Sequence, residues 1–135
     1  MEKLIVPAGV GYLDEVTDFV EALLEEQGCP MKTQLQIRLA VEEVFVNIAS
    51  YAYPDGSGEA EVCCEILPDP ARIRIRFTDS GIPFDPLARE DADTSEEGLM
   101  GREGGLGILL VKKTMDEVVY GRTEGKNILT MTKQL

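Results

Sequence analysis

A predominantly apolar segment, Leu39–Pro54, most constrains this chain, because its sequence LAVEEVFVNIASYAYP carries Glu43 and Asn47 four residues apart. On a helix, side chains at i and i+4 lie on one face about one turn apart, so the carboxylate and the carboxamide face the same space. Burying such groups without partners costs about 1–3 kcal/mol each. Two interpretations follow: a satisfied polar pair at a helix edge, or a site for a polar ligand such as a magnesium-bound phosphate with its attacking hydroxyl.

The neighbouring Glu42 is a weaker candidate for that site. At about 100° per residue, Glu42 lies about 140° around the helix from Asn47, whereas Glu43 lies within about 40°. Glu43 is therefore the expected base.

Two glycine-bearing segments downstream favour the ligand site. Phe77–Pro86, FTDSGIPFDP, predicts an apolar strand that ends at Asp79, with Gly81 two residues later. Such a carboxylate accepts a hydrogen bond from an amine such as that of adenine, and the glycine lets the backbone approach a flat ring. Gly105–Val119, GLGILLVKKTMDEVV, predicts a glycine turn at a helix N-terminus, where backbone amides and the helix dipole bind phosphate. Each glycine motif alone also marks an ordinary turn.

Together these motifs resemble the N, G1 and G2 boxes of the GHKL ATPase superfamily: E-x-x-x-N (Glu43, Asn47), D-x-G (Asp79, Gly81) and G-L-G (Gly105, Leu106, Gly107). The continuation GLGILLVKKTMDEVVY and the closing NILTMTK more specifically resemble the small anti-sigma-factor serine kinases of bacterial partner-switching systems. The resemblance extends from Leu4 to the C-terminus. It implies a Bergerat, or histidine-kinase-like ATPase, fold that binds ATP and Mg²⁺ and forms a homodimer. It also implies phosphorylation of a serine on an anti-anti-sigma-factor protein and sequestration of a sigma factor.

The resemblance further implies roles for individual residues. Asn47 is expected to hold Mg²⁺ through its side-chain oxygen, and Glu43 to orient or deprotonate the attacking serine hydroxyl. Asp79 is expected to accept a hydrogen bond from the adenine amine. The other residues expected around the nucleotide are Tyr51, Gly81, Pro83, Phe84, Arg102, Gly105, Leu106, Gly107 and Thr130.

Three of these positions depart from the family pattern or leave a choice. Pro83 stands where the G1 box commonly has a second glycine, which removes an amide donor. Arg102 is the expected lid arginine near the γ-phosphate. Asn127 and Thr130 compete to support Asp79.

The stretch from Leu87 to Gly104, LAREDADTSEEGLMGREG, lacks a sustained apolar period and lies between the two glycine motifs. That is the position of the mobile ATP lid in this superfamily. A plain solvated loop is the other interpretation of the same composition.

The rest of the chain predicts a single α+β domain, residues 1–135. Its expected elements are an edge strand at Lys3–Pro7, helices at Tyr12–Gln27 and from a capping box at Thr33 and Gln36 to Ala52, and strands at Ala60–Leu67, Arg72–Phe77, Val118–Arg122 and Ile128–Lys133. The order of elements predicts a two-layer α/β sandwich, with a mixed, mostly antiparallel sheet and helices on one face.

Composition excludes several classes of protein. Asp and Glu number 25 against 13 Lys and Arg, a net charge of −12 that repels a nucleic-acid backbone. The absence of histidine excludes a histidine base, a Cys/His zinc site and a phosphoacceptor histidine. No signal peptide or membrane span is predicted, so we expect a cytoplasmic protein with its three cysteines as free thiols.

Acidic residues on the first helix form a solvated face or a docking surface for a basic partner: Asp14, Asp18, Glu21 and Glu25.

Two functions of different class remain open. One is a serine kinase that is also an anti-sigma factor. The other is a nucleotide-gated binding module that acts by sequestration alone, and slow ATP hydrolysis without a protein substrate is a weaker third.

Overall fold

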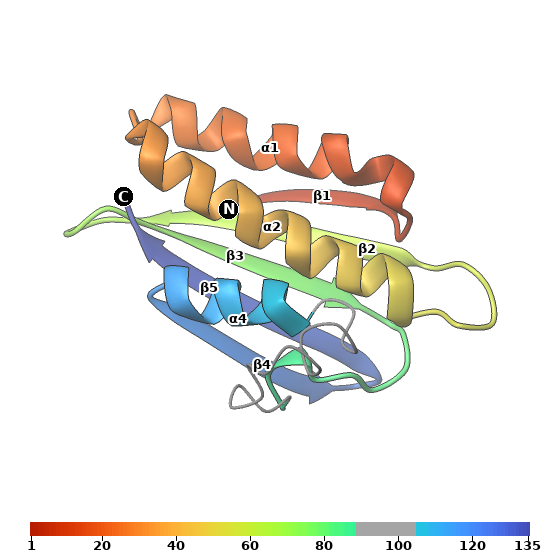
Figure 1. The fold of residues 1–135 in the computed structure, drawn as a ribbon. Coiled ribbons are helices and arrows are strands. Elements are labelled where there is room, and N and C mark those ends of the chain that lie inside the picture. The colour runs from red at the N-terminus through yellow and green to blue at the C-terminus, as the bar shows by residue number, and fades with distance from the viewer. Residues whose placement is uncertain (89–104) are drawn as a thin grey trace.

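The computed structural model describes residues 1–88 and 105–135. The elements in these ranges are β1 (Glu2–Pro7), the 3-10 turn η1 (Val10–Tyr12), α1 (Leu13–Glu26), α2 (Met31–Tyr51), β2 (Glu59–Leu67), β3 (Arg72–Asp79), the 3-10 turn η2 (Pro86–Ala88), α4 (Gly105–Thr114), β4 (Glu117–Thr123) and β5 (Lys126–Gln134). A layer of helices covers a layer of strands (Figure 1). The predicted α+β two-layer sandwich is confirmed.

The sheet has five strands in the order β1-β2-β3-β5-β4. Every neighbouring pair is antiparallel, so the expectation of a mixed sheet is wrong for the described residues. The reason lies in the connection through α4. That connection returns the chain so that β4 runs parallel to β3, but β5 then folds back between them and pairs with both in antiparallel register.

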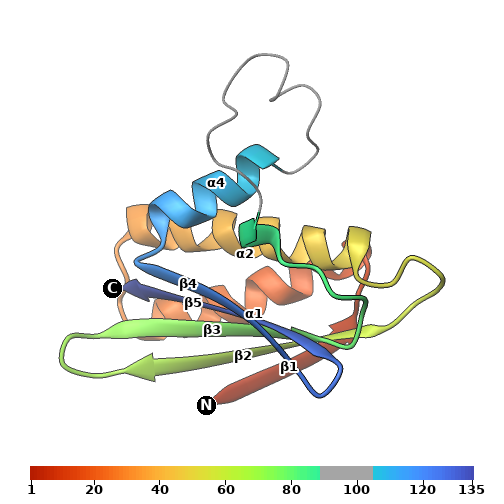
Figure 2. The same cartoon turned by 90° about the horizontal axis from the view of Figure 1, so that it is seen from below.

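Only one face of the sheet carries the core, because side chains alternate along each strand. On β3, Ile73, Ile75 and Phe77 are buried and pack with helical residues such as Phe45. The arginines at positions 72, 74 and 76 face the other side, where Arg74 pairs with Glu65 of β2 at 2.8 Å. Seen from below, α2 and α4 lie on the same side of the strands (Figure 2).

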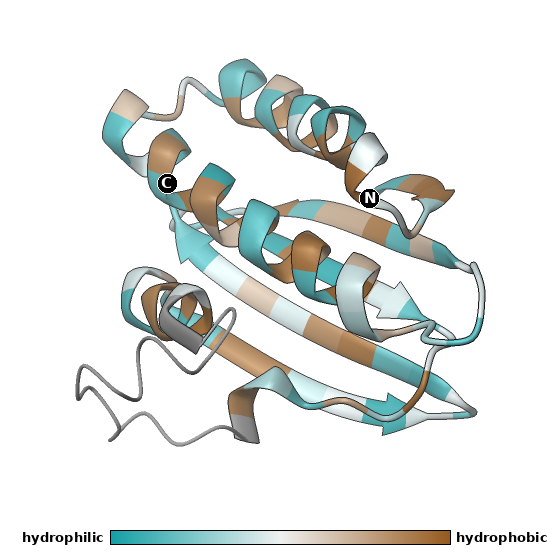
Figure 3. Ribbon diagram, turned by 45° about the vertical axis from the view of Figure 1, so that its right-hand side comes forward, coloured by the Kyte–Doolittle hydropathy of each residue, from teal (hydrophilic) through white to brown (hydrophobic). Residues whose placement is uncertain are grey.

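Helix α2 lies between α1 and α4 on the sheet (Figure 1). Hydrophilic residues follow the outer side of α1, and its inner side is apolar (Figure 3). On that inner side Val16, Val20 and Leu24 are buried. Because α2 is central, its C-terminal half packs against both the sheet and α4. Glu43 and Asn47 lie in this half.

The sequence placed the strands and helices to within a few residues, but the predicted capping box is wrong. Helix α2 begins at Met31 after Pro30, with no side-chain cap. The proline fixes its own φ and marks the start of the helix in place of Thr33. The side chain of Gln34 instead donates to the carbonyl of Cys29 at 2.8 Å.

The three cysteines are free thiols, as expected, and all are buried. Burial raises the pKa of Cys64 to about 12. No helix in the described residues is long and apolar enough to cross a membrane.

Candidate functional site

Helix α2 brings Glu43 and Asn47 to the face that looks toward α4 and the cleft beside it. Asn47 is 5% exposed, and its Nδ2 donates to the backbone carbonyl of Glu43, one turn earlier, at 2.7 Å. This bond fixes the orientation of the carboxamide. Within residues 1–88 and 105–135 no donor reaches Oδ1, so this hard oxygen is available as an acceptor or metal ligand.

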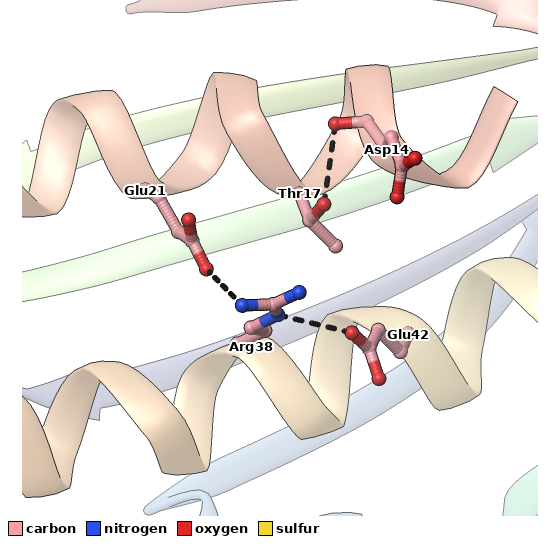
Figure 4. Close-up of polar contacts among 5 residues, drawn as sticks. All are labelled: Asp14, Thr17, Glu21, Arg38 and Glu42. Carbon is pink, nitrogen blue, oxygen red and sulfur yellow. Dashed lines mark hydrogen bonds and ion pairs between the residues drawn. The ribbon is translucent and has the colours of Figure 1, made fainter.

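Arg38 lies between Glu21 of α1 and Glu42 of α2 (Figure 4). Its Nε donates to Glu42 at 3.1 Å, and its Nη1 lies 3.3 Å from Glu21 of α1. Arg38 therefore ties α1 to α2 and holds Glu42 on the α1 side of the helix. The pairs are partly exposed, so solvent screens them and they contribute little to stability. The prediction that Glu42 does not share the face of Asn47 is confirmed.

Glu43 packs directly against the backbone of Gly107 in the first turn of α4. A side-chain carbon at position 107 would overlap the carboxyl group of Glu43, so only glycine leaves room for it. Burial, with a smaller contribution from the negative charge of Glu42, raises the pKa of the Glu43 carboxyl. Within the described residues Glu43 has no cationic partner. A desolvated, unpaired carboxylate of this kind is a stronger base than an exposed one.

Gly105, Leu106 and Gly107 belong to α4 itself (Gly105–Thr114), at its N-terminal side, where the sequence predicted a helix. Gly107 contacts the Glu43 carboxylate, so the positive end of the helix dipole lies on the side of Glu43. The first backbone amides of a helix have no partner within it and bind anions readily.

Asp79 is the last residue of β3 and is 6% exposed. Its Oδ1 accepts two hydrogen bonds, from the amide of Gly81 at 2.9 Å and from Nδ2 of Asn127 at 3.0 Å. Gly81 approaches the backbone carbonyl of Ala52 so closely that a side-chain carbon would overlap it. The next amide, that of Ile82, donates to the same carbonyl at 2.9 Å. The D-x-G motif is thereby packed against the end of α2.

A cleft between α2 and the sheet joins these groups and holds about 390 Å³ of empty space, part of it open to solvent. Its walls are mostly apolar, and its polar groups come from Asn47, Asp79 and Asn127. The lining residues are Val44, Asn47, Ile48, Ala52, Phe77, Asp79, Phe84, Pro86, Asn127 and Leu129. A mostly apolar cleft with a carboxylate in its lining suits a heteroaromatic base with an exocyclic amine.

Other predicted residues lie at various distances from this cleft. The ring of Phe84 lines it and stacks on Tyr51 with centroids 5.5 Å apart, so Tyr51 supports the wall from behind. Pro83 is exposed and lines a more open groove next to the cleft. Leu106 lies in α4, and nothing is described of its side chain. Arg102 and the lid prediction, apart from Leu87 and Ala88 in η2, fall outside the described residues.

Of the two residues that compete to support Asp79, the structure favours Asn127 over Thr130. Thr130 lies opposite Arg76 in the sheet, on the face away from the helices. Asn127, three residues earlier, lies opposite Asp79 and makes the hydrogen bond instead. The difference follows from register, because a shift of an odd number of residues moves a side chain to the other face.

Sequence reasoning missed two further residues of the site, both on β4. Arg122 donates through Nη1 to the Gly81 carbonyl at 3.1 Å and to Oδ1 of Asn127 at 3.0 Å. The hydroxyl of Tyr120 also donates to Oδ1 of Asn127. The only sequence signal for them was their position in the strand that precedes the hairpin to Asn127.

The donor set fits a magnesium nucleotide better than a bare metal ion. Among the described residues, no three His, Cys, Asp or Glu side chains gather around one point. In phosphoryl-transfer sites Mg²⁺ is held by one or two protein oxygens together with phosphate oxygens and water. Among the described residues no donor reaches Oδ1 of Asn47, so this atom can supply one such oxygen.

Comparison with known proteins agrees with this geometry. Residues 6–133 match the family model described as histidine kinase-like ATPase domain. Serine-protein kinase RsbW of Staphylococcus aureus strain JH9 is 30% identical over 98% of this chain and 86% of its own length. RsbW of Listeria monocytogenes serovar 1/2a is 31% identical over 73% of this chain and 64% of its own length.

Among solved structures, the histidine kinase domain from the Erythrobacter litoralis EL346 blue-light activated histidine kinase shares the fold, with a TM-score of 0.60 at 21% identity. The match covers 96% of this chain and spans 62% of that solved chain. The chain therefore belongs to the histidine kinase-like ATPase family and, through its similarity to RsbW, to the anti-sigma-factor serine kinases of the GHKL superfamily.

Proposed function

We propose that this protein is an ATP- and Mg²⁺-dependent serine kinase and anti-sigma factor of a partner-switching system. Its substrate is a serine hydroxyl on an anti-anti-sigma-factor protein, and in the absence of that partner it sequesters a sigma factor in the cytoplasm. The observation that carries the kinase assignment is the contact of Glu43 with Gly107. It places an unpaired, desolvated carboxylate at the positive end of α4, one turn from the free oxygen of Asn47.

Different residues bind the two ends of the nucleotide. At the base end, Asp79 accepts a hydrogen bond from the adenine amine, and the apolar walls of the cleft enclose the ring. At the phosphate end, the amides that begin α4 bind phosphate oxygens. Asn47 would hold Mg²⁺ through Oδ1, and the bound ion would supply positive charge to the phosphates. These contacts position the reactants, which is the main contribution of a protein to phosphoryl transfer.

Glu43 acts on the incoming hydroxyl. Its carboxylate accepts the serine proton or orients the hydroxyl toward the phosphate, and its raised pKa makes it a better acceptor. Activity should therefore rise with pH as Glu43 ionises, and level off above its pKa. Gly107 keeps Glu43 close to the phosphate-binding amides, because any larger residue would displace the carboxylate.

Glu43→Gln tests the assignment with a matched control one residue away. Glutamine keeps the shape and loses the basicity, so ATP affinity is nearly preserved while phosphorylation of the partner falls on the order of 10²–10⁴-fold. Glu42→Gln removes a carboxylate that pairs with Arg38 on the other side of the helix, so it leaves phosphorylation close to wild type. The assay follows labelled phosphate from ATP to a partner that co-purifies from the source cell, beside calorimetric titration with ATP.

The result also separates the kinase from a nucleotide-gated binding module. A wild-type protein that binds ATP and its partner but transfers no phosphate would refute the kinase and leave the module standing. Sigma-factor binding survives Glu43→Gln under both proposals, because it depends on the nucleotide-bound shape.

We also propose that the protein acts as a homodimer. Strand β1 is at the edge of the sheet and pairs on one side only, with β2. Its free edge offers unpaired backbone groups, and Ile5 at its centre is 53% exposed. An edge of this kind supports association of two copies about a two-fold axis.

A further inference from the structure

Asn127 is the most connected polar side chain of the site. Its Nδ2 donates to Oδ1 of Asp79 at 3.0 Å and to the carbonyl of Ile82 at 2.7 Å. Its Oδ1 accepts from Nη1 of Arg122 at 3.0 Å, from the Tyr120 hydroxyl and from the amide of Phe84 at 3.4 Å. The residue is 5% exposed. Three donors therefore face its oxygen and two acceptors face its nitrogen.

This arrangement fixes the polarity of the carboxamide. A flipped amide would oppose donors to donors and acceptors to acceptors, and a carboxylate could not donate to Asp79 or Ile82 at all. The same bonds hold the loop that follows β3. The Gly81 carbonyl is bonded to Arg122, the Ile82 carbonyl to Asn127, and the Phe84 amide to Asn127.

Asn127 also determines which oxygen of Asp79 is left for a ligand. Oδ1 is occupied by two donors, the amide of Gly81 and Nδ2 of Asn127. Among residues 1–88 and 105–135, no donor reaches Oδ2, and Asp79 lines the cleft. A carboxylate oxygen in this position accepts hydrogen bonds and cannot donate them.

We propose that Asn127 is the positioning residue that makes Asp79 selective: by holding Oδ1 it fixes the orientation of the carboxylate and leaves Oδ2, which only accepts hydrogen bonds, for the ligand, so the cleft takes a 6-amino purine and rejects a 6-oxo purine. This inference rests on the proposed binding of ATP. It assigns base selectivity to a residue that need not touch the nucleotide. Tyr120 and Arg122 contribute by fixing the amide of Asn127 in the donating orientation.

Asn127→Asp tests the proposal, because it keeps the size of the side chain and replaces the donor by a second carboxylate facing Asp79. ATP and inosine triphosphate are titrated in parallel; the latter carries an oxo group in place of the 6-amino group. We expect wild type to prefer ATP by about tenfold or more, the range of a hydrogen bond to a charged group. In the variant, ATP affinity at pH 8 falls by about tenfold or more, and the preference drops below about threefold.

The pH dependence of the variant separates positioning from general damage. The titratable groups that contact position 127 are Asp79 of β3 and Tyr120 and Arg122 of β4, and α2 contributes none to the cleft lining. Two carboxylates at this distance repel until one takes up a proton, which restores a donor between them. ATP affinity of the variant relative to wild type should therefore recover as pH falls from 8 to 6. A variant that is merely destabilised loses affinity for both nucleotides alike, with no recovery.

Thr130→Val is the matched control, on the opposite face of the same strand, and it leaves both affinities and their ratio unchanged. Thermal melting verifies that each variant folds. If Asn127→Asp does not fold, Asn127→Thr replaces it. Its hydroxyl keeps a donor for one of the two acceptors, so ATP affinity falls several-fold with no pH dependence.

Each outcome decides a different point. Loss of the ATP preference with recovery at low pH supports the proposal. Equal ATP affinity and preference in wild type and the Asn127 variant overturn it and leave the ATP site intact. A wild type that binds both nucleotides equally overturns it as well, and a wild type that binds neither refutes the proposed function together with this inference.

Discussion

Gly107→Ala is the sharpest perturbation that the structure offers, because it acts on one contact. The added methyl group would overlap the carboxyl group of Glu43, and the three nearest atoms all belong to that group. The neighbour is the far end of a flexible side chain, so Glu43 can rotate away without moving the backbone. Alanine in a helix is more favourable than glycine by about 0.5–1 kcal/mol, and release of Glu43 to solvent removes a desolvation cost. We therefore expect the free energy of unfolding to rise by up to about 1 kcal/mol.

Activity should change in the opposite direction. A displaced Glu43 no longer lies at the phosphate-binding turn, so phosphorylation falls toward the level of Glu43→Gln, a loss on the order of 10²–10⁴-fold. The pKa of Glu43 should return toward its ordinary value, because burial is what raises it. The measurements are urea unfolding, transfer of labelled phosphate, and an NMR titration of the Glu43 carboxyl. Gly121→Ala, at an exposed position of β4 with nothing within 4 Å of the added carbon, controls for the substitution itself.

Two results would refute this reasoning. Full phosphorylation by Gly107→Ala, with the pKa of Glu43 still raised, would show that the contact does not position the base. A loss of several kcal/mol in the free energy of unfolding would show that Glu43 cannot move aside.

Further predictions concern the base site, the charge of Glu43 and assembly. Asp79→Asn should weaken ATP binding by about 1.5–3 kcal/mol, because an ionic acceptor is lost; equal affinity by calorimetry would contradict the assignment. Gly81→Ala should unfold at clearly lower urea, because its methyl group meets the Ala52 backbone. Burial raises the pKa of Glu43 in the folded state, so the wild type loses stability as pH rises through that pKa and the carboxyl ionises. Glutamine does not ionise, so the urea midpoint of Glu43→Gln should rise relative to that of wild type from pH 5 to pH 8. Light scattering at tens of micromolar should give the mass of a dimer, and a strictly monomeric mass would count against the edge of β1.

The order of the predicted helices and strands was enough to predict the fold class, and local pattern located several residues of the candidate site. Glu43 and Asn47 share a face because helical geometry alone determines that i and i+4 coincide. The same helical geometry predicts that Glu42 lies on a different face of the helix. Asp79 at the end of a strand and Gly105 at the start of a helix were also visible from local pattern, because alternation and helix punctuation are properties of a few neighbouring residues.

What the sequence could not determine are contacts between segments distant along the chain. The support of Asp79 depends on the register of β3 against β5, and that register selected Asn127 over Thr130. The insertion of β5 between β3 and β4 made the sheet wholly antiparallel and brought Arg122 to the loop after β3. The need for glycine at position 107 arises only where α4 packs on α2. Local propensity does not determine such pairings. They depend on how whole helices and strands pack their apolar faces against one another.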